Sequence, residues 1–135
     1  MDNTWAFNLG TVIFSKVKAE SLLKLKTKYP SIVFTTSDRN KGNPVYPTVY
    51  IHELPGAERS DDLRGITINA VNETIQVEVI TDSSQSDARY IMSIVGSIFK
   101  SMGFQINNMP NFDNGATYYR LVMRCQKLIG SGEHF

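Results

Sequence analysis

Residues 66–102 read ITINAVNETIQVEVITDSSQSDARYIMSIVGSIFKSM, and this stretch decides the fold. Within residues 70–81, Ile75, Val77 and Val79 are spaced two apart, so they point to one face of a predicted strand. That face is the one we expect to be buried. The polar residues of the strand are assigned to its other face: Glu73, Gln76 and Glu78.

A polar turn and a helix follow this strand. Ser84, with Asp87 three residues later, resembles a capping box at the start of a helix. Apolar residues then recur every three or four positions, which is typical of a helix packed on one side. Gly103 is suited to the C-cap. The apolar stripe of this predicted helix consists of Ala88, Ile91, Met92, Val95, Ile98, Phe99 and Met102.

The rest of the chain supplies one further helix and four strands. We expect a helix over 11–29, ended by Pro30, with Phe14, Leu22, Leu25 and Tyr29 on its apolar face. Residues 1–10 are predicted as a strand or an extended arm, because Trp5, Phe7 and Leu9 alternate. The other expected segments are strands over 31–36, 47–54, 104–109 and 116–128, loops over 37–46 and 55–65, a turn over 110–115 and a flexible tail over 130–135.

This order of elements, α-β-β-β-α-β-β, predicts an α+β fold: one mostly antiparallel sheet with two main helices packed on one face. The chain has 135 residues and shows no internal repeat or linker, so we expect a single domain over 1–135.

Composition excludes several classes of protein. A net charge of +1 does not indicate a nucleic-acid or membrane surface, and 20% charged residues is ordinary for a globular domain. Cys125 is the one cysteine, so no internal disulfide forms and a reducing compartment is favoured. We expect no signal peptide, because a basic segment followed by an apolar segment is missing at the N-terminus. No apolar run is long enough to span a bilayer.

Catalytic and metal-binding motifs are missing as well. The sequence has no nucleophile elbow, zinc-protease motif, Walker loop or dinucleotide-binding glycine pattern. His52 and His134 are far apart, and Cys125 falls on the apolar face of a strand. We therefore expect no enzyme activity, no catalytic residue, no metal site and no cofactor.

The polar face of the central strand is the feature that points to binding. If the strands over 70–81 and 116–128 are neighbours, Glu73, Gln76 and Glu78 lie across from Arg120, Arg124 and Gln126. Opposite charges on facing strands stabilise a sheet by about 0.2–1 kcal/mol per pair. Two interpretations stay open: a face exposed to solvent, or an interface that docks a neighbouring subunit.

Four segments together resemble a known family. They read LKTKYPSIVFTTSD (25–38), YPTVYIHELPGAE (46–58), INAVNETIQVEVITDSSQSDARYIMSIVGSIFKSMGF (68–104) and MPNFDNGATYYRLVMRCQKLIGSGE (109–133). In order and spacing the chain resembles the tail terminator (tail completion) proteins of long-tailed, siphovirus-like bacteriophages of Gram-positive bacteria.

The resemblance implies a structural role in the virion. Proteins of this family form a ring, typically a homohexamer, that caps the tail tube, stops its polymerisation and docks the head-side connector. The implied partners are the protein itself, the tail tube protein and the connector, with DNA only passing through the lumen and no membrane. The implied location is the head–tail interface, after assembly in the host cytoplasm; neither enzyme activity nor a cofactor is implied.

Exposed polar residues of the loops and of the polar sheet face are the candidate interface residues. They are Asp38, Arg39, Lys41, Glu58, Arg59, Asp61, Asp62, Glu78, Asn111, Asp113, Arg120 and Arg124. Asp61 and Asp62 are further expected to face the lumen of a ring, where negative charge would repel DNA phosphates.

Two other functions stay open at this point. A head-completion or connector protein would share the size and the context. A small nucleic-acid-binding α+β domain would use Tyr118 for stacking and Arg120 and Arg124 for phosphate contacts.

Overall fold

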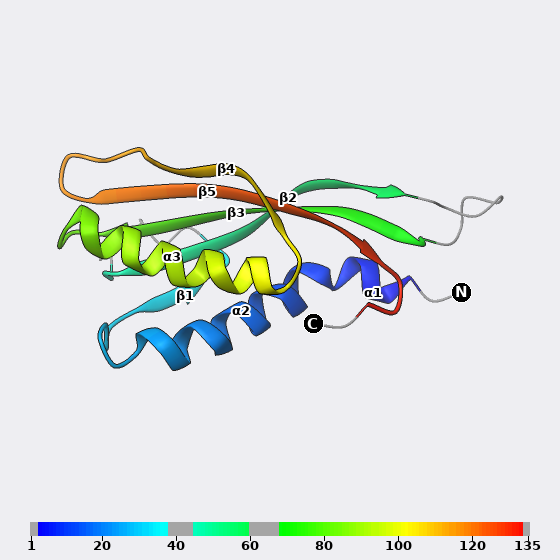
Figure 1. The fold of residues 1–135 in the computed structure, drawn as a ribbon, viewed down its shortest axis with the longest axis horizontal. Helices are drawn as coiled ribbons and strands as arrows, with labels where there is room; N and C mark the ends of the chain where they lie inside the picture. Colours follow the sequence, from blue (N-terminus) through cyan, green and yellow to red (C-terminus); the bar gives the residue numbers. More distant parts are fainter. Residues whose placement is uncertain (1–2, 38–44, 60–67, 134–135) are drawn as a thin grey trace.

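The computed structural model describes residues 3–37, 45–59 and 68–133, and of residues 56–59 it describes the backbone alone. Three helices and five strands follow one another along the chain (Figure 1). Their bounds are α1 Thr4–Phe7, α2 Leu9–Leu25, β1 Val33–Thr35, β2 Thr48–Arg59, β3 Ala70–Thr81, α3 Gln85–Ser101, β4 Gln105–Phe112 and β5 Tyr119–Gly130.

The five strands form one sheet in the order β1-β2-β3-β5-β4. β1 pairs with β2 in parallel, and the other three pairings are antiparallel. The helices lie together on one side of the sheet, below it in Figure 1, and the other side has no helix on it in the part of the chain that is described. The α+β prediction is confirmed, and the sheet is mixed because of β1.

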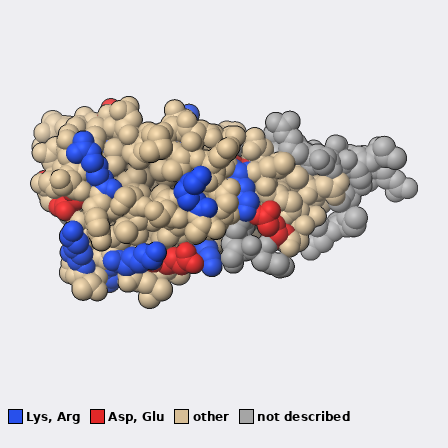
Figure 2. All heavy atoms as spheres, viewed as in Figure 1, with Lys and Arg blue, Asp and Glu red and all other residues tan. Residues whose placement is uncertain are grey.

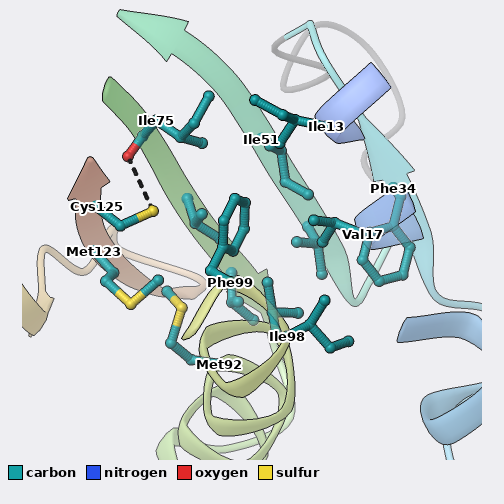
Figure 3. Packing of buried hydrophobic residues seen from close by; sticks show 14 of the residues in the cluster. Ile13, Val17, Phe34, Ile51, Ile75, Met92, Ile98, Phe99, Met123 and Cys125 are labelled. Atoms are coloured by element: carbon teal, nitrogen blue, oxygen red, sulfur yellow. Dashed lines mark hydrogen bonds between the residues drawn. The ribbon is translucent and has the colours of Figure 1, made fainter. Parts of the chain in front are cut away.

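The core lies between the sheet and the two long helices. Odd-numbered residues of β3, namely Ile75, Val77 and Val79, are almost fully buried on the face that α3 covers, as their spacing predicted. Phe99 of α3 points toward this face of the sheet (Figure 3) and packs edge-on against Phe104 at a centroid distance of 5.2 Å. Burial of these side chains is the main source of stability for a layer of helices on a sheet.

The start of α3 is capped as the sequence predicted. The Asp87 backbone N–H donates to Ser84 Oγ at 3.1 Å, and the Tyr29 hydroxyl donates to Asp87 Oδ1 at 2.9 Å. The Ser83 hydroxyl donates to Asp87 Oδ2 at 2.6 Å. The hydrogen bonds from Ser83 and Tyr29 lower the pKa of Asp87, and a charged carboxylate is favourable at a helix N-terminus. Tyr29 therefore ties the segment after α2 to the first turn of α3. At the other end Gly103 has φ +93°, a left-handed conformation that glycine adopts readily.

The N-terminal segment differs from the prediction. Trp5 and Phe7 lie in the helix α1 and Leu9 begins α2, so the strand or extended arm expected for residues 1–10 is wrong over the described part. The buried face of α2 is also rotated from the expected one. It consists of Leu9, Ile13, Val17, Ser21 and Leu25, a stripe with a spacing of four that begins before the predicted helix.

Two strands are longer than predicted because each runs through a proline. β2 continues through Pro55 to Arg59, and β4 continues through Pro110 to Phe112. The pairing of β2 with β3 shifts register between Leu54 and Ala57, and β1 pairs with β2 only up to Tyr50. β4 is an edge strand of the described sheet. Both prolines thus stand at irregular or edge positions, where a missing N–H is tolerated.

The predicted turn between the last two strands also lies later in the chain. The Asp113 N–H donates to the Arg120 carbonyl oxygen at 2.8 Å, and the Gly115 N–H donates to that of Tyr118 at 3.1 Å. Asn114 and Gly115 therefore precede the tip of the hairpin and do not form a two-residue turn.

Candidate interface on the uncovered face of the sheet

Even-numbered side chains of β3 and β5 share the sheet face that the helices leave uncovered. In the register of the two strands Gln76 lies opposite Arg124, and Glu78 lies opposite Val122. Tyr50 and His52 of β2 lie on the same face, opposite Glu78 and Gln76. Gln76 thus lies across from an arginine of the last strand as predicted, while Glu78 lies diagonally from Arg120 and contacts it.

Glu78 is the centre of this face. Although no helix covers it, its exposed fraction is only 4%. The Arg120 guanidinium donates to Glu78 Oε1 from Nε and lies in ion-pair contact through Nη2, and Gln76 Nε2 donates to Oε2 at 3.2 Å. Two protein side chains thus hold a buried carboxylate, one of them charged, which is the condition for burying it without a large penalty.

His52 adds a titratable neighbour to Glu78. Its Nε2 lies 3.3 Å from Glu78 Oε2, within ion-pair distance for a protonated ring, but the two atoms are not aligned as a hydrogen bond. The ring stacks on Tyr50 with a centroid distance of 4.4 Å and an interplanar angle of 6°. His52 is half-buried on this face of the sheet.

Arg120 also connects β3 to the hairpin between β4 and β5. Its Nη1 donates to Asp113 Oδ2, and its backbone N–H donates to Asn114 Oδ1 at 3.1 Å. Next to it Arg124 donates from Nε to Gln76 Oε1 at 2.8 Å. The guanidinium of Arg120 is therefore occupied by two carboxylates of the same face.

Glu78, Arg120, Asp113, Gln76 and Arg124 form one polar cluster. A shallow hollow opens beside this cluster. It has a volume of about 250 Å³ and is lined by polar and aromatic side chains and one isoleucine. Its walls are Tyr50, Glu78, Ile80, Asp113, Asn114, Tyr118 and Arg120. The cluster holds two guanidinium groups, Arg120 and Arg124, and two carboxylates, Glu78 and Asp113. That balance gives no excess of positive charge to attract phosphates, and it suits contact with a protein surface better than contact with nucleic acid.

The structure brings together four of the candidate interface residues, which are Glu78, Asp113, Arg120 and Arg124. Asn111 lies nearby on β4, opposite Val122, and is exposed. Glu58 and Arg59 end β2, paired with Val71 and Ala70. The remaining candidates lie outside the described residues: Asp38, Arg39, Lys41, Asp61 and Asp62.

The sheet face predicted for Glu73 is wrong. Glu73 stands two residues before Ile75, so it lies on the helix-covered face and not on the polar one. Its exposed fraction is 2%, and Oε2 has no hydrogen-bond partner among the described residues. Burial, and then the hydrogen bond and charge of Glu53, raise the pKa of Glu73 to about 8. Gly10 of α2 lies against the Glu53 carboxylate, since a Cβ added there would be 2.7 Å from Oε1.

The strict alternation along the strand already indicated that Glu73 lies on the covered face. Residues 73, 75, 77 and 79 share one face, and reading Glu73 as polar surface ignored its parity. Cys125, by contrast, is buried as predicted, and burial raises the pKa of its thiol to about 12.

Among the described residues no group of three His, Cys, Asp or Glu side chains is arranged to hold a metal ion. No helix in the described part of the chain has the length and apolar character needed to cross a membrane. Comparison of the chain with protein-family models and with curated proteins gives no match. The functional argument therefore depends on the residues and on their arrangement.

Proposed function

We propose that this protein is a structural tail terminator of a long-tailed phage, which closes into a ring of six copies at the end of the tail tube. The observation that carries the proposal is the charge-balanced cluster around Glu78 and Arg120 on the uncovered face of the sheet. A half-buried polar face that is ordered by its own ion pairs needs little rearrangement on binding, which favours a permanent protein contact.

A second supporting feature is the number of separate surfaces on a small body. A terminator has to contact its own copies sideways, the tube on one side and the connector on the other. The described part of this chain offers the uncovered sheet face, the outer face of the helices and the edge strand β4 (Figure 1). Contacts between different surfaces of identical copies close into a ring when the rotation allows it.

The third support is the resemblance of the four segments to this family. They include β3, α3 and β5, which build the core and the cluster. In this proposal the partners are further copies of the chain, the tube protein and the connector, and DNA passes through without being bound. The site of action is the virion, at the joint between head and tail.

Light-scattering mass across a concentration series, alone and then with tail tubes of the same phage, tests this function. Negative-stain images of the tubes complete the experiment. We expect a closed ring in solution or density that caps one end of tubes of fixed length. A chain that stays monomeric and never decorates tube ends would contradict the proposal.

Arg124→Glu sharpens this test because Arg124 is exposed and contributes one hydrogen bond to the cluster. If the uncovered face is a contact surface, this variant weakens ring formation or tube capping while its thermal stability stays near that of the wild type. Lys24→Glu, at an exposed position on α2, is the matched control with the same change in charge.

A further inference from the structure

A groove between α3 and the edge strand β4 lies on the helix side of the molecule, apart from the cluster on the uncovered face. Its volume is about 660 Å³. β4 pairs with β5 along the sheet, while α3 lies over β3 and β5 and reaches β4 only in part. The underside of β4 is therefore left open next to the flank of the helix.

Apolar side chains form the floor of this groove. Met92 of α3 and Met123 of β5 lie at its base, and Ile106 and Phe112 of β4 form its far wall. Met109, also on β4, has an exposed fraction of 71%. Methionines adapt to the shape of a partner because they are unbranched and flexible, and they are common on surfaces that bind helices.

Two cations stand on the helical wall of the groove. Arg89 and Lys100 are eleven residues apart on α3, which is about 16 Å along a helix. Both are exposed, and neither forms an ion pair with a residue that the structure describes. Arg89 lies over the Phe112 ring, 4.9 Å from its centroid. Figure 2 shows the surface over α3 and β4 as mostly tan, with blue side chains on it.

Among the residues that the structure describes, no carboxylate lines this groove. An apolar floor with a cation toward each end is complementary to an apolar stripe that carries a carboxylate toward each end. We propose that the groove between α3 and β4 binds an acidic amphipathic helix of a partner protein.

The form of the occupant follows from β4. An extended segment would have to add to the edge of this strand, but Pro110 and two register shifts interrupt its pairing pattern. Irregularities of this kind prevent the addition of a further strand. A helix laid along the groove makes its contacts through side chains, so an irregular edge does not hinder it.

A second copy of this chain does not match the occupant. Among the described residues the long helices are α2, whose exposed face is rich in lysine, and α3, which forms the wall of the groove itself. The partner is therefore a different protein. This binding site stands independently of the ring proposed above, because a monomer would present the same groove.

Two synthetic peptides test the proposal with the full, ¹⁵N-labelled chain. One is an amphipathic helix whose apolar stripe carries a glutamate near each end, and its twin has lysine at both places. We expect the acidic peptide to shift the amide signals of α3 and β4 and to bind about ten-fold more tightly than the twin, since two ion pairs replace two repulsions.

Charge reversal then tests whether the two cations of the groove cause the preference for the acidic peptide. Arg89→Glu combined with Lys100→Glu should invert the preference, so that the basic peptide binds more tightly. Lys24→Glu combined with Lys26→Glu changes the net charge by the same amount at the C-terminal end of α2 and should leave the preference as it is. The comparison of the two peptides on the wild-type chain needs no variant, so it stays valid if a variant misfolds.

No binding of either peptide, equal binding of both, or signal shifts confined to other elements would overturn the proposal. Shifts of the groove amides with protein concentration alone, without peptide, would assign the groove to a second copy and would overturn it as well.

Discussion

Strand β3 carries two buried glutamates on opposite faces of the sheet, and their surroundings differ. Glu78 lies on the uncovered face, where Arg120 reaches across from β5 to pair with it. Glu73 lies on the covered face beside another carboxylate, Glu53, and one of its oxygens has no partner among the described residues. The pKa of Glu73 is raised to about 8, so this carboxyl keeps its proton at neutral pH.

The comparison shows that the neighbours, and not the degree of burial, decide how a carboxyl is accommodated. The exposed fractions are nearly equal, 4% for Glu78 and 2% for Glu73. A buried acid either acquires a cation or loses its charge by keeping the proton. Lys127 lies opposite Glu73 in the strand register, and its ammonium donates to the Met102 carbonyl oxygen and pairs with Glu133.

The largest effect is expected for Arg120→Ala, which removes the cation and leaves Glu78 buried. We expect a loss of about 3 kcal/mol in the free energy of unfolding, less than for a fully buried pair because the Arg120 side chain is 26% exposed. Urea unfolding at pH 7 measures it. Arg124→Ala is the control, since that side chain is exposed and donates to the neutral Gln76, and it should cost under about 1 kcal/mol.

Glu73→Gln should have the opposite sign, and its effect should depend on pH. The folded pKa of about 8 exceeds the unfolded value of 4.5, so the folded state binds more protons and wild-type stability falls as pH rises from 4.5 to 8. A neutral glutamine removes this loss. We expect the variant to be more stable than the wild type by about 2–3 kcal/mol at pH 6.5 and nearly equal to it at pH 4.5.

Chemical denaturation of both proteins across this pH range is the measurement. Glu20→Gln, at a surface position on α2, is the control that should keep the wild-type slope. A Glu73→Gln variant that keeps this slope would show that another group titrates.

Replacing both members of the pair should cost less than removing one. Glu78→Leu combined with Arg120→Met leaves neither a buried charge nor an unpaired cation, and such exchanges are often nearly neutral. We expect the double variant to lie within about 1 kcal/mol of the wild type. If it is as unstable as Arg120→Ala, packing of the arginine stem, and not the charge left on Glu78, explains the loss.

The smallest effect is expected for Asp113→Asn. The Asp113 side chain is 74% exposed, and its contact with Arg120 is screened by solvent. We expect a loss of about 0.5 kcal/mol or less, measured as a shift of the urea midpoint, and a smaller loss in high salt. A loss as large as that of Arg120→Ala would mean that Asp113, more than Glu78, requires the cation.

Much of the fold could be predicted because local rules and packing agree in the centre of the chain. The alternation through Ile75, Val77 and Val79, the Ser84 cap and the stripe of α3 all have the predicted structure. The N-terminus could not be predicted in this way, since three alternating apolar residues suit a short helix joined to α2 as well as a strand. β2 and β4 run past their prolines because pairing with a neighbouring strand overrides local turn signals there.

The cluster on the uncovered face was partly predictable for the same reason. Even-numbered residues of the two strands share a face if the strands are neighbours, which places Glu78, Arg120 and Arg124 together. The structure has β5 next to β3, as this argument assumes. The contribution of Asp113 depends on the geometry of the hairpin, which sequence spacing does not determine. Glu73 was misassigned because its polarity was given more weight than its position in the alternation.

A carboxyl-detected NMR titration of Glu73 tests the central contrast most directly. In the wild-type chain we expect the Glu73 side-chain carbon to change its chemical shift with a midpoint near pH 8. A midpoint near 4.5, the value for a free glutamate, would contradict the account, because it would mean that the covered face solvates or pairs this charge.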